Sequence, residues 1–349
     1  MPAIGNTYVD LIDIYKRQDP DGSIADVIEM LMELNPMLQD AYAVECNNGT
    51  THRHSIRTGL PSVAWGKLYQ GIAQSKSTFA QVDDATGFVE GLSTVDKRVL
   101  DLSGNQAAVR LSEARGFLEA IAQEVQETLI YGNSNSAPEE FMGFAPRFND
   151  TTAANGNQII SAGGAGADNT SIWMVTWADH AAHLLYPKGT KAGVTREDKG
   201  EQRVLDGSSN AYYVMEELFC QNVGLAVKDW RYVTRVANID LSAMQADPTN
   251  IDGSNNSLYH FLRKAYYAHQ GRRTKHASGK AGFPGGGRTV VYCNSDVLEA
   301  LDALSANAGS NDVFSRLRPM EIQGQEVLTY RGMAIRETDA IHNAEAVVS

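Results

Sequence analysis

The sequence has little of what marks secreted, membrane-spanning or disulfide-bonded proteins. Its three cysteines, Cys46, Cys220 and Cys293, lie far apart without CxxC spacing, which favours buried, reduced thiols over a disulfide framework or a zinc site. No basic stretch followed by an apolar run of signal-peptide length opens it, and no segment reaches ~18 consecutive apolar residues. We therefore expect no disulfides and no membrane partner.

Basic charge is also scarce. The chain of 349 residues has 30 lysines and arginines against 42 aspartates and glutamates, which gives a formal net charge of -12. A protein that wraps nucleic acid by neutralising phosphates needs a concentrated excess of basic residues. This balance argues against such a protein, although a surface that faces DNA without gripping it remains compatible with it.

No catalytic, cofactor-binding or metal-binding motif is complete. His52 and His54 would share one face of a strand, and His180 and His183 one face of a helix, but neither pair has further ligands at metal-site spacing. There is no GxSxG nucleophile elbow on a strand-turn-helix segment. We expect His52 and His54 to be exposed strand residues, His180 and His183 to be ordinary surface or core histidines, and catalytic residues, cofactors and metals to be absent.

The segment from 271 to 288 combines basic and glycine-rich sequence. Basic side chains gather at residues 272–280, just after Tyr266 and Tyr267, a composition that suits contact with phosphate or an acidic neighbour. The run GFPGGGR (282–288) lacks the known phosphate-binding patterns and precedes a strand rather than a helix. A solvated, flexible loop is the favoured interpretation of both.

The clearest secondary-structure signal predicts a helix at about residues 104–131. Ser103 and Gln106 have capping-box spacing, and Gly132 suits the C′ position. One face is marked by apolar side chains, namely Ala107, Leu111, Ala114, Leu118, Ile121, Val125 and Leu129. A helix of this length, on the order of 40 Å, usually crosses a whole domain.

Two segments before this helix lack a core of their own. Residues 24–34 predict a short amphipathic helix stopped by Pro36, and residues 44–102 are polar and β-like with few large apolar side chains. A protein that presents such arms tends to pair them with a neighbouring subunit. The best candidates for contact residues are Trp65, Lys67, Leu68 and Tyr69, with local packing inside the arm as the alternative.

After the helix and a polar loop at 149–170, the sequence becomes rich in strands. Strands are expected at 171–177, 209–218 and 222–240, and the last of these alternates from Trp230 onward as a strand with two different faces. A compact α/β unit follows, with a helix at 258–270, a strand at 289–293, a helix from near Ser295 and two strands around Arg331 and Gly332.

The order of these elements resembles that of tailed-bacteriophage major capsid proteins of the Hong Kong 97-like fold. The resemblance spans nearly the whole chain and is carried by LIYGNSNSAPEEFMGFAPRF (129–148), LYPKGTKAG (185–193), WRYVTRVANID (230–240) and YRGMAIRETDAIHNAEAVV (330–348). It implies an α+β fold with an N-terminal arm (1–43), an extended β-hairpin loop (44–102), a peripheral domain with the spine helix (103–256), an axial domain (257–340) and a terminal strand or tail (341–349).

The resemblance also implies a function. The expected protein is a non-enzymatic shell subunit that forms pentamers and hexamers of an icosahedral virion capsid in the host bacterial cytoplasm and touches packaged double-stranded DNA non-specifically. The sequence enters the arm almost directly, so we expect a separate scaffolding protein besides the portal. Lys67 and Lys76 lie in the loop, but no covalent crosslinking is predicted. A nanocompartment shell protein of the encapsulin type, which shares the fold, remains the alternative.

Overall fold

The computed structural model describes residues 35–102, 105–273, 287–307, 317–322 and 325–349. The helices are α2 (Pro36–Asp40), α3 (Lys97–Leu102), α4 (Gln106–Tyr131), α5 (Phe144–Arg147), α6 (Leu241–Ala246), α7 (Leu258–Ala268) and α9 (Ser295–Asn307), with short 3-10 turns η1 (Gly156–Gln158) and η2 (Trp230–Tyr232). The strands are β1 (Ala43–Glu45), β2 (Thr51–Gly59), β3 (Thr78–Asp96), β4 (Ile159–Ser161), β5 (Asn169–Trp177), β6 (Ala182–Tyr186), β7 (Val194–Leu205), β8 (Ala211–Val227), β9 (Val233–Asp240), β10 (Arg288–Cys293), β11 (Arg318–Ile322), β12 (Gln325–Tyr330) and β13 (Met333–Glu337).

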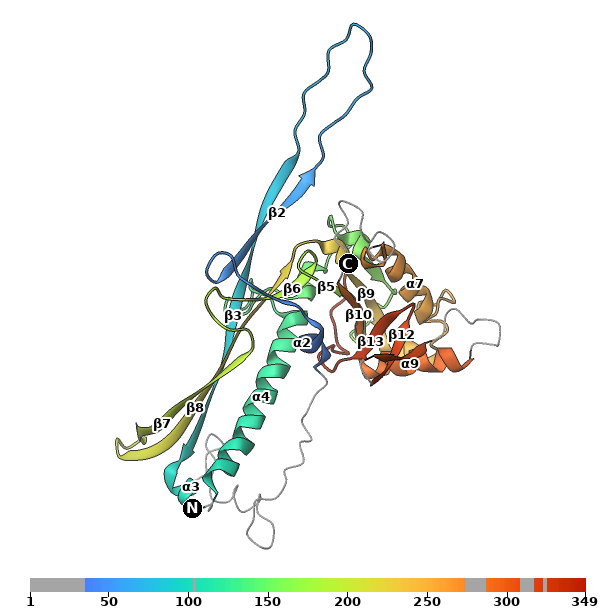
Figure 1. The fold of residues 1–349 in the computed structure, drawn as a ribbon. Coiled ribbons are helices and arrows are strands. Elements are labelled where there is room, and N and C mark those ends of the chain that lie inside the picture. Colours follow the sequence, from blue (N-terminus) through green and yellow to red (C-terminus); the bar gives the residue numbers. More distant parts are fainter. Residues whose placement is uncertain (1–34, 103–104, 274–286, 308–316, 323–324) are drawn as a thin grey trace.

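One continuous ladder of strands connects a lobe to a projecting hairpin. Its order is β11-β12-β13-β10-β5-β6-β8-β3-β2, with β7 beside β8 and β9 beside β5. Figure 1 shows the lobe around β9, β10, α7 and α9, the long helix α4 along β3 and β8, and the β2–β3 hairpin extending away from both. The hairpin is therefore an extension of the same sheet that supports the core.

The core lies on both faces of the central strands. One apolar cluster contains the buried side of α4 together with Phe144, Phe148 and Trp173, and the other packs α7 and α9 against the opposite face. Strand β5 is buried along its whole length because both faces are covered. This explains the strong β5 signal in the sequence, where apolar and aromatic residues run almost without interruption.

The spine helix was predicted at nearly its observed bounds, but its caps differ. Ser103 lies outside the described residues, and the N-cap is Asn105, whose side chain accepts a hydrogen bond from the Ala108 N–H at 3.2 Å. Gly132 follows the last residue with φ of -49°, so it is not the left-handed residue expected. Glycine is needed there for space, since a Cβ would lie 2.6 Å from the Thr128 carbonyl oxygen and 2.7 Å from that of Phe141.

The predicted apolar face of this helix is right in its second half and only partly right in its first, where Ala114 is buried but Ala107 is exposed. Ile121, Val125 and Leu129 are buried, whereas Leu111 and Leu118 are about half exposed. The first half of α4 packs against β3, β8 and the short helix α3, and Phe117 stacks on Phe219 of β8 with ring centroids 5.6 Å apart. The helix is therefore rotated so that Phe117 faces the sheet and the two leucines face solvent.

Three further expectations need correction. Residues 230–232 form the turn η2 rather than the start of a strand, and β9 is buried along both faces up to Asp240. The segment of His180 and His183 is not a helix, because β6 begins at Ala182. Strand β7 was missed, since it is so rich in charge that only its pairing with β8 defines it.

The N-terminal segment was expected to be separate from the body, and for α2 this is wrong. Met37 is completely buried in the main core. The buried carboxylate of Asp40 pairs with Arg288 and Arg336 and accepts a hydrogen bond from the Tyr292 hydroxyl at 3.0 Å. The predicted amphipathic helix at 24–34 lies outside the described residues.

The C-terminal residues are held by a buried ion pair. Arg235 donates to the Glu345 carboxylate at 2.8 Å, and the other oxygen of Glu345 accepts hydrogen bonds from Tyr131 and Ser171 at 2.6 and 2.7 Å. The Arg235 guanidinium also stacks over Trp173 at 4.9 Å. Spine helix, central sheet and chain end are thus joined at one point.

Replacing Glu345 by alanine should destabilise the fold strongly. The substitution leaves the Arg235 charge buried without its partner, which costs about 3–5 kcal/mol of unfolding free energy. Urea denaturation of the unassembled subunit measures this loss. The matched control is Glu139→Ala, an exposed residue with the same change in charge, for which we expect less than about 0.5 kcal/mol. Equal effects for the two variants would contradict the assigned role.

Candidate subunit interface

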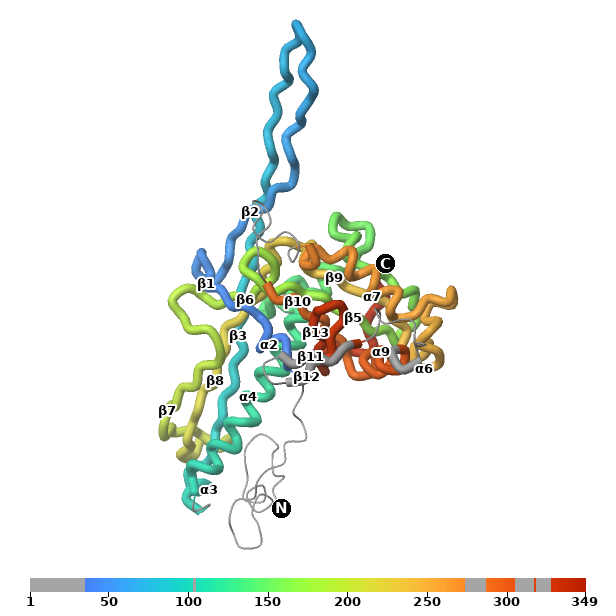
Figure 2. Tube along the Cα trace, turned by 45° about the vertical axis from the view of Figure 1, so that its right-hand side comes forward, coloured from blue at the N-terminus to red at the C-terminus, as the bar shows by residue number. Residues whose placement is uncertain are grey.

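The hairpin has a paired stem and an unpaired tip. Strands β2 and β3 pair antiparallel from Thr51 opposite Ala85 to Gly59 opposite Thr78. Residues 60–77 form no strand and close the far end, which Figure 2 shows well away from the lobe. Side chains at this tip therefore meet other parts of the same chain only within the loop itself.

The predicted contact residues all lie at this tip. Trp65 is 98% exposed and Leu68 is 90% exposed, while Tyr69 and Lys67 are also open to solvent. Local packing inside the arm, the alternative considered from the sequence, is not observed for these side chains. Leu60, Val63 and Ile72 are exposed beside them and were missed, because isolated aliphatic residues give no periodic signal. A contiguous group of exposed large apolar side chains is typical of an interaction surface.

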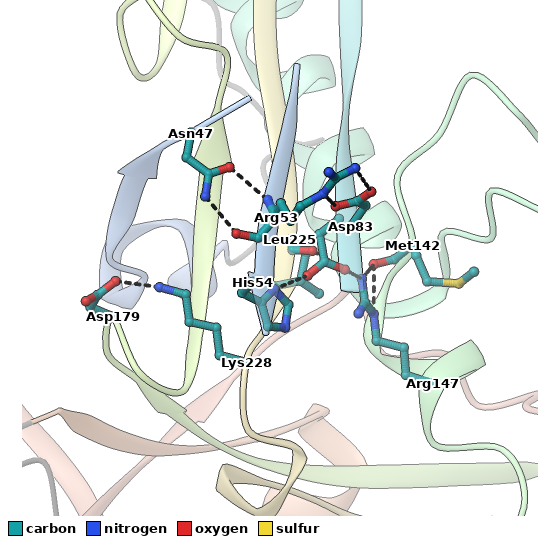
Figure 3. A network of polar contacts seen from close by, with 10 residues as sticks. Asn47, Arg53, His54, Asp83, Met142, Arg147, Asp179, Leu225 and Lys228 are labelled. Carbon is teal, nitrogen blue, oxygen red and sulfur yellow. Dashed lines mark hydrogen bonds and ion pairs between the residues drawn. The ribbon is translucent and has the colours of Figure 1, made fainter. Parts of the chain in front are cut away.

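The stem is fixed to the body by polar contacts at its base, shown in Figure 3. Arg53 and Asp83 form a two-pronged ion pair at 2.7 and 2.8 Å across the hairpin, which holds the pKa of Asp83 below its usual range. Asp84 accepts from Arg147 at 2.8 Å, and Arg147 also donates to the backbone carbonyls of Met142 and Leu225. The base of the hairpin therefore has a defined orientation relative to the body.

The histidines of the stem are not exposed, contrary to expectation. His52 is buried, the His54 side chain is nearly so, and the His52 ring meets that of His183 edge-on with centroids 5.6 Å apart. The alternating pattern of β2 could not reveal this, because the strand that covers His52 lies more than a hundred residues later in the sequence. Burial lowers the pKa of all three, and that of His183 to about 4.

The other candidates from the sequence are not brought together. His180 packs edge-on against Tyr232, with ring centroids 5.3 Å apart, rather than joining His183. Arg272 stacks over Tyr267 at 5.0 Å, while residues 274–280 lie outside the described part of the chain. The described residues contain no group of three or more His, Cys, Asp or Glu placed to hold a metal ion. None of the described helices is long and apolar enough to span a bilayer.

The fold combines a long helix on an extended sheet, a projecting hairpin with an apolar tip, and a lobe. One protein family matches the sequence over most of its length. The family described as major capsid protein GP7 matches residues 19–349. The chain belongs to this family. It is a bacteriophage major capsid protein, a component of the virion shell, and the predicted Hong Kong 97-like α+β fold is confirmed.

Several solved structures are similar to this chain, and the first described below supports the assignment. A chain from the cryo-EM structure of bacteriophage epsilon15 is 30% identical, with a TM-score of 0.77 over 100% of this chain and 99% of that one. The bacteriophage JBD30 capsid is 9% identical, with a TM-score of 0.50 over 89% and 93%. An encapsulin complex from Synechococcus elongatus is 11% identical, with a TM-score of 0.42 over 62% and 93%. No curated protein matches this chain.

The two ion pairs at the hairpin base should contribute differently to the unfolding free energy. Arg147→Met leaves the Asp84 carboxylate largely buried without its cation, so we expect the unfolding free energy to fall by about 1–3 kcal/mol or more. Asp84→Asn in the same protein should restore part of the loss, which a double-mutant cycle in urea measures.

The matched control is Arg53→Met, which breaks the solvent-exposed pair with the neighbouring Asp83. Exposed ion pairs contribute little to stability, so this variant should remain close to the parent protein. An additive cycle, or equal losses for Arg147→Met and Arg53→Met, would show that Arg147 does not anchor the hairpin.

Proposed function

We propose that each subunit contacts its neighbour through the tip of the β2–β3 hairpin and that these contacts build a closed shell of pentamers and hexamers with icosahedral symmetry. The observation that carries this proposal is the exposure of Trp65, Leu68 and Tyr69 on an arm whose base is fixed to the body. Apolar side chains exposed to water at the end of an oriented arm are stabilised only when another surface buries them.

The proposed anatomy follows the family resemblance. Residues 1–43 form an N-terminal arm, 44–102 the extended loop, 103–256 the peripheral domain, 257–340 the axial domain and 341–349 a terminal strand or tail. Within the extended loop, the second half of β3 pairs with β8 along its length, so the projecting part is the stem and tip that precede it.

The shell encloses double-stranded DNA, assembles in the host bacterial cytoplasm with a separate scaffolding protein and a portal, and has no enzymatic role. The net charge of -12 supports the enclosure of DNA, because a container for DNA must confine the polymer without binding it tightly. The alternative of an encapsulin-type compartment has weaker support, since the family match and the most similar structure reported above both point to phage particles.

Trp65→Ala should impair assembly without affecting the fold. The side chain contacts almost nothing in its own chain, so subunit stability should stay unchanged, while loss of an aromatic anchor weakens each contact by about 2 kcal/mol or more. The concentration needed for assembly should rise about 30-fold or more. Sedimentation and negative-stain electron microscopy, with and without candidate scaffold, measure it.

Gln74→Ala is the matched control, because it truncates an exposed polar residue of the same loop. It should assemble like the parent protein. Unchanged assembly of Trp65→Ala, or a parent protein that stays monomeric under all conditions, would contradict the proposal. Particles that protect DNA from nuclease support a phage capsid, and particles that contain protein cargo instead support the encapsulin alternative.

A further inference from the structure

The joint between hairpin and body contains a cluster of three histidines. His52 and His54 come from β2, in the hairpin stem, and His183 comes from β6, in the body. The His52 ring lies 6.4 Å from that of His54 and 5.6 Å from that of His183. Among the described strands, β2 pairs only with β3, whereas β6 pairs with β1, β5 and β8. The ring contact therefore links hairpin and body through side chains.

The histidines are buried without the hydrogen bonds that buried polar groups usually make. Both ring nitrogens of His54, Nδ1 of His52 and one carboxylate oxygen of Asp84 have no hydrogen-bond partner in the described structure. The nearest approach joins His54 Nδ1 to that Asp84 oxygen at 3.7 Å, which is too long for a hydrogen bond. Buried polar atoms without partners are costly, so these rings stay in place because the surrounding elements hold them.

The charged groups around the cluster oppose its protonation. Lys228, which follows β8, faces all three rings, and Arg147 of α5 faces His54. Two carboxylates are near, but each already has a cation: Asp84 pairs with Arg147, and Asp179 with Lys228, both at 2.8 Å. A proton on any ring would add positive charge to a buried site in which the available negative charge is already neutralised.

We propose that His52, His54 and His183 form a proton-sensitive joint, in which neutral rings hold the hairpin against the body and protonated rings release it. The release is a property of the single subunit. Its consequence, that acid loosens the contacts between subunits, rests on the function proposed above for the hairpin tip.

The direction of the pH effect follows from the lowered pKa values. Burial, with help from Lys228, lowers the pKa of His183 to about 4, and release of the hairpin raises this pKa toward the ordinary value of 6.5, which is its upper limit. Between these values the released state binds more protons than the held state. The held state is thus fully favoured above pH 6.5 and loses its advantage as the pH falls toward 4. At pH 5.0, His183 alone shifts the equilibrium toward release by up to about 30-fold.

Hydrogen exchange of the unassembled subunit at pH 7.5 and pH 5.0, corrected for the intrinsic pH dependence of amide exchange, tests this proposal. In the parent protein we expect the paired stem residues of β2 and of β3 up to Ala85 to lose protection at pH 5.0. Amides of α9 serve as an internal reference, because Val297 and Leu301 are buried in the lobe and the helix contains no histidine. Loss of protection that is equal in stem and reference would mean general acid unfolding and would overturn the proposal.

Variants that cannot gain the charge complete the test. His183→Gln, and the milder His54→Gln should the first fail to fold, keep a neutral polar side chain, so stem protection should fall much less between the two pH values. His260→Gln on α7, away from the joint, should behave like the parent protein. A stem that opens in acid equally in His54→Gln or His183→Gln, or that stays protected at pH 5.0 in the parent, would contradict the joint. Because no step requires assembly, this outcome is independent of whether the tip proposal holds.

Discussion

The continuity of strand β3 is the constraint on which the rest of the structure depends. Its first part pairs with β2 in the hairpin, and its second part pairs with β8 from Thr86 to Asp96. The same strand therefore belongs to the projecting arm and to the sheet of the body. Helix α4 braces this sheet through Phe117, which lies so close to β3 that a Cβ at Gly91 would come within 2.8 Å of its ring. Arm, sheet and spine helix thus form one mechanical unit.

This arrangement explains how a shell subunit can present a specific contact surface. The fold directs an apolar tip away from its own core, and the ion pairs and histidines at the base set the direction. One contact between a hairpin tip and a neighbouring subunit, as proposed above, is weak. Many such contacts repeated around a closed assembly reinforce one another and can raise avidity by ~10²–10⁴. The same logic makes the base of the hairpin a sensitive point, since a small change in its orientation is repeated at every subunit.

Much of the fold was predictable from local patterns. The spine helix, strand β5, and the closing strands around Arg331 and Gly332 appear where sequence periodicity and turn chemistry placed them. These elements carry their own signals, either an apolar stripe, a nearly continuous apolar run or a turn with two positive φ values. Trp65 and its neighbours also stand out in a polar segment, and they lie exposed at the tip, while their contact with another subunit stays a prediction.

What could not be predicted depends on partners distant in the sequence. Leu118 looked like a core residue until the sheet proved to contact Phe117 instead. His52 looked exposed, because nothing in β2 reveals that β6 covers it. Strand β7 is defined only by its pairing with β8. In each case the decisive interaction is tertiary, and no window along the chain contains both partners.

Solvent accessibility of the hairpin tip before and after assembly tests the central claim most directly. Hydroxyl-radical footprinting, read by mass spectrometry, can compare Trp65 and Tyr69 in unassembled subunits and in purified shells. The account predicts that both are modified readily in the subunit, where they are exposed, and are strongly protected in the shell. Equal modification of the tip in subunits and in shells would contradict it.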